Sequence, residues 1–474
     1  MALQLRRTKI IATLGPATDA PGMLERLLVE GVDVVRLNLS HGDPADHKQR
    51  AATVRKAAAD LGREVAVLAD LQGPKIRIER FAGGPVQLEP NQPFTLDCRE
   101  DAPPGDATRV GVSYHDLWRD VKPGDVLLLD DGLVSLEVVD VANRQLRCSV
   151  LVGGRLSDRK GINRLGGGLT VAALSDKDRA DIVLSAELEA DFLAVSFVKT
   201  ADDIEQARKL LKAAGGTAAL VAKIERAEAI ENLAEIVEVS DAVMVARGDL
   251  GVEIGAATVP LLQKRIILHC LEAGKPVITA TQMLESMTEH AEPTRAEASD
   301  VANAVLDGTS AVMLSAETAT GNYPVAAVQT MDRIARAVEP SMGYRHQTPR
   351  PGEDTTVGRA MSNAACDLAE TLGASAILVP TFTGRTASAV ARLRPHRPIV
   401  GLSHHQTAVQ QMALEWGVTP VLIPPTENVE DLWARSLEAA LTVGVVETGD
   451  RVVTTAGTAV NLPGSTNVIK VDIA

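Results

Sequence analysis

Short runs of branched apolar residues alternate with longer amphipathic stretches along most of the chain. We interpret the runs as buried parallel strands, because such strands are covered on both faces and are nearly continuously apolar. The predicted strands are Lys9–Leu14, Val32–Leu37, Val65–Ala69, Phe192–Val195, Leu220–Ile224, Ala242–Val245, Val277–Ala280 and Ala311–Leu314. The predicted helices between them include Pro44–Leu61, Ala201–Ala213, Ala227–Val239, Leu261–Ala273 and Thr294–Leu306. Eight strand–helix units in one register predict an α/β fold, a (β/α)8 TIM barrel of about 250 residues.

The third strand–helix unit is interrupted. After Gln72-Gly73-Pro74 the pattern changes until about Gly168, and turns such as Lys122–Asp125 separate short strands such as Val126–Leu129 and Leu133–Val139. This pattern predicts an inserted antiparallel β-barrel domain. Because the βα loops of a barrel lie on its catalytic face, the insertion could act as a lid.

A second change of pattern follows the barrel. The chain becomes polar and rich in Pro and Gly around Pro340–Asp354, which predicts a linker. Helix–strand alternation then resumes in the segments Gly358–Leu372, Ala376–Val379, Ala387–Leu393, Ile399–Gly401, Val421–Ile423 and Leu432–Val443. We therefore predict a barrel over residues 1–71 and 169–340, a lid over 72–168, and a C-terminal α/β regulatory domain over 355–474.

Composition and charge exclude several classes of protein. Hydrophobic residues make up 45% and charged residues 23% of the 474 residues, as in a globular protein with a large core. The net charge of −14 argues against broad binding to nucleic acid or to an anionic membrane. The four cysteines are scattered without a CxxC pair, which indicates a reducing compartment rather than disulfides or a zinc site. Without an apolar leader or a run of about 20 apolar residues, the chain is expected to be cytoplasmic.

Polar residues follow the predicted barrel strands, at the end where barrel enzymes place their active sites. They are Thr13, Arg36, Asn38, Asp70, Ser196, Lys223, Glu225, Arg247, Asp249, Thr281, Ser315 and Glu317. Two carboxylates on neighbouring strands, Glu225 and Asp249, suit Mg²⁺ or Mn²⁺, which prefer oxygen ligands. Lys223 and Arg36 suit an anionic substrate that carries a phosphoryl group. The Gly turn Ala246–Gly251 offers backbone N–H groups to a carboxylate or phosphate. Together these groups predict phosphoryl transfer.

These segments resemble blocks of the pyruvate kinase family. Leu220–Arg226 resembles the family signature around its catalytic Lys. Further blocks of the family resemble Val35–Gly42, Met244–Glu253, Ala280–Met287, Pro293–Asp307 and Met313–Thr318. The match runs from Lys9 to the C-terminus in the family's order of barrel, lid, barrel and C-terminal domain. It implies a glycolytic phosphotransferase that converts phosphoenolpyruvate and ADP into pyruvate and ATP. It also implies a homotetramer, because the family forms tetramers with two-fold interfaces.

The resemblance implies a role for each residue at the strand ends. Glu225 and Asp249 would bind a Mg²⁺ ion (or Mn²⁺) that also contacts the substrate. Lys223 would stabilise charge on the transferring phosphoryl group and on the enolate, and Arg36 would hold the phosphoryl group. Gly248 would contact the substrate. Thr281, Ser315 and Glu317 would deliver a proton to the enolate. The nucleotide would be bound by Asn38, His41, Arg77 and the lid residue Lys160. A second Mg²⁺ would arrive with ADP.

The segment Asp70–Arg77 departs from the members of the family that require K⁺. In those members the ion lies beside the residues that match Asn38, Ser40 and Asp70. At the positions of Leu71, Gln72 and Lys75 they have Thr, Lys and Glu. The resemblance is therefore to the K⁺-independent branch, in which the Lys75 ammonium would replace the monovalent cation.

A second candidate site lies in the predicted C-terminal domain. The segment Thr381-Phe382-Thr383-Gly384-Arg385-Thr386 follows a predicted strand and precedes a helix. Its hydroxyls, Gly turn and Arg predict a phosphate pocket, and it resembles the effector phosphate loop of allosteric pyruvate kinases. The segment Gly457–Asn467 lacks the Trp-Arg pair of the forms that bind fructose 1,6-bisphosphate. We therefore expect a monophosphate, either AMP or a sugar phosphate.

Other interpretations stay open at this stage. The charged residues at the strand ends could form ion pairs that only stabilise a barrel, and the hydroxyls could only cap helices. Lys160 and Lys75 could simply be solvated. A barrel lyase or aldolase that acts on pyruvate enolates could use the same metal carboxylates, although it would not need a lid. A metabolite-binding regulator on a kinase scaffold could also have this architecture, although it would be expected to have lost catalytic residues.

Overall fold

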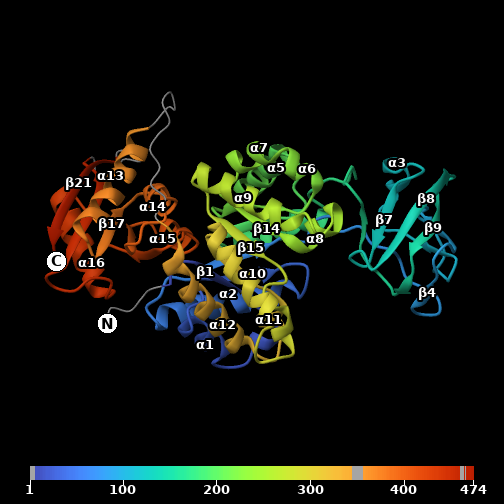
Figure 1. Cartoon of the computed structure of the whole chain (residues 1–474), viewed down its shortest axis with the longest axis horizontal. Coiled ribbons are helices and arrows are strands. Elements are labelled where there is room, and N and C mark those ends of the chain that lie inside the picture. The colour runs from blue at the N-terminus through green and yellow to red at the C-terminus, as the bar shows by residue number, and fades with distance from the viewer. Residues whose placement is uncertain (1–5, 344–355, 459–463, 465) are drawn as a thin grey trace.

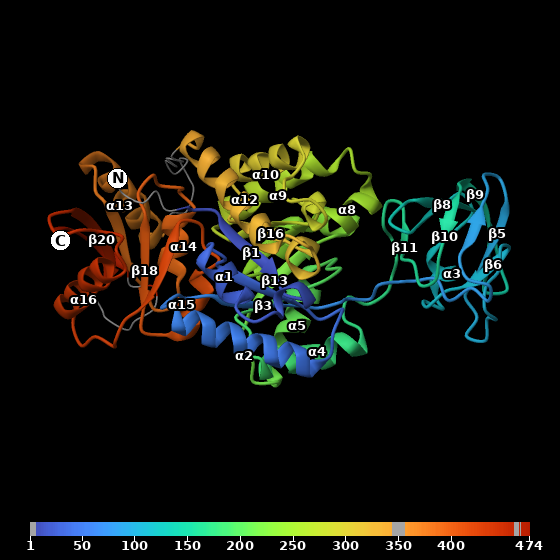
Figure 2. The same cartoon turned by 90° about the horizontal axis from the view of Figure 1, so that it is seen from below.

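A computed structural model describes residues 6–343, 356–458, 464 and 466–474. The molecule is elongated, with three parts in a row: the C-terminal domain at one end, the barrel in the middle and the lid at the other end (Figures 1 and 2). The linker predicted over Pro340–Asp354 lies largely outside the described residues. The domain limits given above stay predictions. No helix in the described part of the chain is long and apolar enough to cross a membrane.

The central part is a closed barrel of eight parallel strands, which confirms the predicted fold class. Its strands are β1 (Lys9–Thr13), β2 (Val34–Asn38), β3 (Ala66–Asp70), β12 (Phe192–Val195), β13 (Ala219–Ile224), β14 (Ala242–Ala246), β15 (Val277–Ala280) and β16 (Ala311–Leu314). The surrounding helices include α1 (Met23–Val29), α2 (Pro44–Asp60), α4 (Asp176–Glu187), α5 (Ala201–Ala213), α9 (Val259–Ala273), α10 (Arg295–Asp307) and α12 (Pro324–Val338). The strands are apolar on both sides, because one face fills the barrel and the other packs against the helices.

Two predicted elements differ from the structure. The helix predicted over Ala227–Val239 is two helices, α6 (Ala227–Glu231) and α7 (Leu233–Val239). Asn232 separates them, since its backbone leaves the helical region and its side chain donates to the Lys199 carbonyl at 2.9 Å. The Gly turn predicted after β14 is instead the start of a helix, α8 (Arg247–Ile254). The groups on Arg247, Gly248 and Asp249 therefore lie in the first turn of a helix.

The lid lies between β3 and α4 and has its own apolar core. Six strands form a mainly antiparallel sheet in the order β11-β7-β8-β9-β5-β6, and β4 pairs with β10 beside it. Their bounds are β4 (Val86–Leu88), β5 (Pro93–Asp97), β6 (Arg109–Gly111), β7 (Val126–Leu129), β8 (Val134–Ala142), β9 (Gln145–Val152), β10 (Gly154–Leu156) and β11 (Ile162–Arg164). Figure 2 shows that the lid stands away from the barrel and that β11 is the lid strand nearest to it. The segments beside β11 and β3 therefore form the two connections between the barrel and the lid, which we call the hinge.

The C-terminal domain is a five-stranded sheet in the order β19-β18-β17-β20-β21, parallel except for β21. Its elements include α13 (Val357–Leu372), β17 (Ala376–Pro380), α14 (Arg385–Ala391), β18 (Ile399–Ser403), α15 (Gln406–Met412), β19 (Val418–Leu422), α16 (Val429–Thr442), β20 (Arg451–Gly457) and β21 (Thr466–Ile473). Ala413 and Leu414, just after α15, pack with residues of the barrel interior. Nearby, Lys9 on β1 donates to the Val418 carbonyl at 2.7 Å. The domain thus closes the N-terminal end of the barrel, opposite the lid.

Candidate active site at the mouth of the barrel

A buried carboxylate, Asp70, joins the two cations predicted for phosphoryl binding. Asp70 ends β3 and is 1% exposed. Its Oδ2 lies 2.7 Å from Nε of Arg36 on β2, and its Oδ1 lies 3.3 Å from Nζ of Lys223 on β13. The same ammonium lies 2.9 Å from Oε1 of Glu225 and donates to the Ser196 hydroxyl at 2.7 Å. Three oxygens therefore fix Lys223, and Asp70 holds it beside Arg36. We call these five residues the Asp70 network.

Burial and charge shift the pKa values of this network. Burial alone would lower the pKa of Lys223 and raise that of Asp70. The attraction of Lys223 for Asp70 and Glu225, with that of Arg36 for Asp70, outweighs burial, so the Lys223 pKa is raised and the Asp70 pKa is lowered. Lys223 is therefore held as a cation and Asp70 as an anion at neutral pH. A buried cation in the mouth of a barrel can stabilise negative charge on a bound substrate.

A second group of residues lies on the loops after β14 and β15. The Gly248 amide donates to the Thr281 hydroxyl at 2.9 Å, and this hydroxyl is 2.7 Å from the Ala280 carbonyl. Thr281 has φ +65°, in the left-handed region that a β-branched residue rarely adopts. Arg247, predicted at the mouth, has partners of its own. Its guanidinium binds the Ala280 and Thr281 carbonyls and the Asp300 carboxylate, because these groups surround it at the start of α8. It holds the Thr281 loop in its unusual conformation.

The carboxylates of Glu225 and Asp249 fit a divalent cation. Glu225 is 1% exposed, and its other oxygen accepts from the Phe197 amide at 2.8 Å. Burial, together with repulsion from Asp249, raises the pKa of Glu225 in spite of the attraction of Lys223. A cation between the two carboxylates would remove this repulsion. Two carboxylates leave most of the coordination of Mg²⁺ to substrate and water, as is usual for this ion at phosphate sites.

Lys75 also reaches Asp249. Its Nζ lies 3.6 Å from Oδ1 of Asp249, and both side chains are about 30% exposed. The residue leaves the barrel at the start of the lid, two positions after Gly73, which has φ +70°. A Cβ at Gly73 would come within 2.5 Å of the Phe197 ring, so the chain passes close to the mouth here. From the sequence, Lys75 is expected near Asn38, Ser40, Asp70 and Leu71. In the structure Lys75 forms an ion pair with Asp249, a candidate metal ligand.

On the β16 side of the mouth, Glu317 connects two loops. Its carboxylate accepts from the amide of Ser315 at 2.7 Å and from that of Leu284, in the loop after β15, at 3.1 Å. Burial raises the pKa of Glu317. Glu317 thus joins the Ser315 loop to the Thr281 loop, which keeps the three residues predicted for proton delivery in one region.

The residues predicted for nucleotide binding have partners of their own. Asn38, the last residue of β2, accepts from the Ser40 amide at 3.1 Å, and the His41 carbonyl, just beyond β2, is 2.8 Å from the His47 ring. In the lid, Arg77 donates to the Arg159 carbonyl at 3.0 Å. Lys160 pairs with Asp130 at 2.7 Å. The structure therefore places the first two beside the mouth and the last two in lid segments that flank the lid strands.

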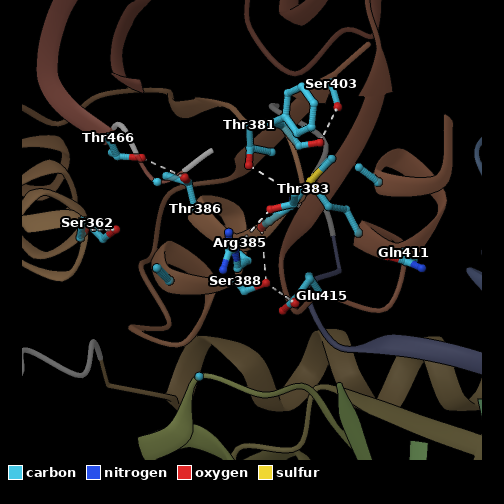
Figure 3. A pocket seen from close by; sticks show the side chains of 18 of the residues that line it. Ser362, Thr381, Thr383, Arg385, Thr386, Ser388, Ser403, Gln411, Glu415 and Thr466 are labelled. Atoms are coloured by element: carbon cyan, nitrogen blue, oxygen red, sulfur yellow. Dashed lines mark hydrogen bonds between the residues drawn. The ribbon is translucent and has the colours of Figure 1, made fainter. Parts of the chain in front are cut away.

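The segment Thr381–Thr386 borders a cavity of about 950 Å³ between the C-terminal domain and the barrel (Figure 3). Thr381 Oγ1 accepts from the Gly384 amide at 3.1 Å, and Arg385 donates to the Thr383 hydroxyl at 3.3 Å. The Thr386 hydroxyl lies 3.0 Å from that of Thr466 on β21. A Cβ at Gly384, where φ is +84°, would lie 3.2 Å from the Met412 side chain, so the tight turn favours Gly. The loop predicted from Gly457 to Asn467 lies largely outside the described residues.

The cavity also has a charged floor. Lys275 and Glu272 line it from the barrel side, and Glu415 lines it from the segment after α15. Glu415 Oε1 lies 2.5 Å from the hydroxyl of Ser388 on α14, the helix that begins at Arg385 (Figure 3). Sequence reasoning missed Glu415, because nothing in the local pattern distinguishes it from a surface residue.

Comparisons with known proteins agree with this geometry. Residues 5–328 match the family model for the pyruvate kinase barrel domain, and residues 359–472 match that for the pyruvate kinase alpha/beta domain. The chain is 46% identical to pyruvate kinase II of Salmonella typhimurium over 99% of both chains. It is 44% identical to the pyruvate kinase of Corynebacterium glutamicum (99% of this chain, 98% of the relative) and 40% identical to that of Clostridium acetobutylicum (99% and 100%). The chain therefore belongs to the pyruvate kinase family of phosphotransferases.

Proposed function

We propose that the mouth of the barrel transfers the phosphoryl group of phosphoenolpyruvate to ADP, with the Asp70 network as its centre. The observation that carries this proposal is the position of Lys223, a buried ammonium held by Asp70, Glu225 and Ser196 next to Arg36. Phosphoryl transfer needs positive charge fixed around the group in flight more than it needs covalent chemistry. In this proposal Arg36 binds the phosphoryl oxygens, and Lys223 faces both the transferring group and the enolate oxygen that forms.

We propose Glu225 and Asp249 as the ligands of a Mg²⁺ or Mn²⁺ ion. When bound, the ion would neutralise negative charge on the substrate carboxylate and phosphate. The Gly248 amide, which precedes Asp249 in the chain, and the Thr281 hydroxyl, which accepts from this amide, would hold the substrate carboxylate. The helix α8 begins at this point, and its first amide groups favour an anion.

Protonation of the enolate at C3 completes the reaction, and we assign it to the Thr281 side of the mouth. Thr281 is held at positive φ by Arg247, so its hydroxyl has one orientation toward Gly248. We propose that Thr281 orients a water molecule for proton delivery and that Glu317 positions this loop and Ser315. Asn38 and His41 on the barrel and Arg77 and Lys160 on the lid would contact the nucleotide, with a second Mg²⁺ bound to ADP.

We also propose that the enzyme does not need K⁺. Lys75 supports this, since it brings an ammonium to within 3.6 Å of Asp249 at the edge of the mouth. A tethered ammonium supplies a monovalent positive charge without a separate binding equilibrium. It also repels a free cation nearby.

A phosphorylated metabolite is proposed to bind the cavity at Thr381, Thr383, Gly384, Arg385 and Thr386 and to activate the enzyme. Arg385 is exposed at the rim of the cavity, where a phosphate would accept from its guanidinium and from the Thr hydroxyls. One phosphate site favours a monophosphate, AMP or a sugar phosphate. We further propose a cytoplasmic homotetramer, by analogy with the family.

A coupled assay of pyruvate formation tests the proposed reaction and separates it from the alternatives. With purified protein, phosphoenolpyruvate, ADP and Mg²⁺, we expect pyruvate and ATP in equal amounts. Omission of ADP, or chelation of the metal, should abolish the reaction. Pyruvate formed without ADP would mean that the phosphoryl group is transferred to water, and the absence of any turnover would fit a lyase or a regulator, so either result would overturn the proposal.

A further inference from the structure

The chain returns from the lid to the barrel through three consecutive glycines, Gly166, Gly167 and Gly168. Their φ angles are +83°, +76° and +88°, which residues with a side chain rarely adopt. A Cβ at Gly168 would lie 2.1 Å from the Arg164 guanidinium, and one at Gly167 would lie 2.8 Å from the Glu228 carboxylate. The return segment is thus flexible by composition, yet it fits closely against charged side chains.

Residues of the barrel hold the return segment at three points. Glu228 accepts from the Gly168 amide at 2.5 Å, and Arg226 donates to the Leu169 carbonyl at 3.3 Å. The backbone carbonyl of Glu253 accepts from the Gly166 amide at 2.9 Å. We call Arg226, Glu228 and Glu253 the hinge clamp.

A buried ion pair forms the centre of the hinge clamp. Nε of Arg226 lies 3.1 Å from Oε1 of Glu253, and the two residues are 3% and 0% exposed. The other oxygen of Glu253 accepts from the Ala227 amide at 3.0 Å. Burial raises the pKa of Glu253 to about 7 in spite of the attraction of Arg226. Removal of either residue would leave the other one buried without its partner, which is strongly destabilising.

The same pair connects the two segments that carry the proposed metal ligands. Arg226 directly follows Glu225 at the end of β13, and Glu253 lies one helical turn after Asp249 on α8. Lid strand β11 also contacts α8. Whatever moves the return segment of the lid therefore acts on the backbone that positions both carboxylates.

We propose that the hinge clamp is a positioning element which joins the lid hinge to the Glu225 and Asp249 segments, so that the state of the hinge sets the affinity of the divalent-metal site. The proposal rests on the assignment of Glu225 and Asp249 as metal ligands. Neither Arg226 nor Glu253 needs to touch metal or substrate. When the pair is intact, the metal site is preformed and the hinge is ordered. When the pair is broken, the affinity for the metal falls and the hinge becomes less ordered.

Two measurements that do not depend on turnover test this coupling. Hydrogen exchange of the peptide covering residues 164–171 reports on the hinge, and the electron paramagnetic resonance signal of free Mn²⁺ reports on metal binding. The variants are Glu253→Gln, Arg226→Met and the two combined. The matched control is Arg147→Met, which breaks the exposed Arg147–Asp140 pair inside the lid.

We expect each single variant to exchange at the hinge at least about tenfold faster and to bind Mn²⁺ about 10- to 100-fold more weakly, as partners behind metal ligands usually do. The double variant should be no worse than the singles, because both changes remove one interaction. Should the Glu253 and Arg226 variants fail to fold, Glu228→Gln, whose side chain is partly exposed, is expected to give the same two changes. Arg147→Met should give neither.

Either measurement can overturn the proposal. Mn²⁺ affinity within twofold of the unmodified protein in folded clamp variants would refute the coupling, and so would faster hinge exchange without weaker metal binding. A wrong assignment of Glu225 and Asp249 as metal ligands would give a different result. Asp249→Asn would then leave Mn²⁺ binding unchanged in a protein with an intact hinge clamp.

Discussion

Exchanging the charge of Lys75 should turn the enzyme into one that requires K⁺. In Lys75→Glu a carboxylate replaces the ammonium that lies 3.6 Å from Asp249. At this distance two unit charges interact by about 5 kcal/mol at an effective dielectric of 20. Since both side chains are nearly a third exposed, solvent screening reduces the ion pair to about 1 kcal/mol.

Coulomb's law also gives the expected effect of the Lys75 ammonium on the binding of K⁺. A free cation about 4 Å from the ammonium is disfavoured by roughly 1 to 4 kcal/mol, depending on the local dielectric, or about 5- to 1,000-fold in affinity. Replacing the ammonium by a carboxylate changes this repulsion into attraction. The variant should therefore bind K⁺ and should lose activity without it, because the positive charge at the edge of the mouth is then missing.

The assay is pyruvate formation in tetramethylammonium buffer with and without KCl. Mg²⁺ is kept saturating, because a carboxylate beside Asp249 also changes the affinity for the divalent ion. We expect the unmodified enzyme to respond less than about twofold to KCl and Lys75→Glu to respond more than about tenfold, which lies within the estimated range. Lys75→Met is the matched control, with lower activity but no response to K⁺. A more than tenfold response of the unmodified enzyme would refute the reasoning.

Three further changes test other parts of the molecule. Asp70→Asn should lower kcat by about a hundredfold in a folded protein, because Lys223 and Arg36 lose the group that holds them together; unchanged kinetics would contradict this role. Arg385→Ala should abolish activation by AMP and by sugar monophosphates but leave the basal rate intact, and a normal response to every effector would exclude the pocket. Burial raises the pKa of Glu415 to about 7. A carboxyl with a raised pKa in the folded state stabilises the fold below about pH 4.5 and loses this contribution as the pH rises through 7. Between pH 4.5 and pH 8 the free energy of unfolding of Glu415→Gln should therefore rise by up to about 3 kcal/mol relative to that of the unmodified protein. Calorimetry that shows a stability difference independent of pH would rule this out.

The sequence predicted the barrel because its strands are continuous apolar runs of distinctive length. β12 and β13 illustrate this, since local composition alone determines where they lie. The break at Asn232 was not predictable in the same way. It depends on a hydrogen bond to Lys199, 33 residues away, that only the packed structure provides.

The candidate site likewise has some features that local sequence predicts and others that depend on residues far away in the chain. The strand-end pattern predicted that Lys223, Glu225 and Asp249 lie together, because residues at the carboxyl ends of barrel strands converge whatever the details of packing. It did not identify how they pair. Asp70 was expected only near a cation site, whereas the structure places it between Arg36 and Lys223. The direction of Arg247 also follows from the loop after β15, which the sequence near Arg247 does not describe.

The central claim is that the Lys223 ammonium stabilises charge during phosphoryl transfer. The most direct measurement compares steady-state pyruvate formation by the unmodified enzyme and by Lys223→Met, with circular dichroism to establish that both are folded. Because this charge develops mainly in the transition state, kcat should fall by roughly three orders of magnitude or more while KM for phosphoenolpyruvate changes much less. A folded Lys223→Met variant that keeps a tenth of the original kcat would contradict the account.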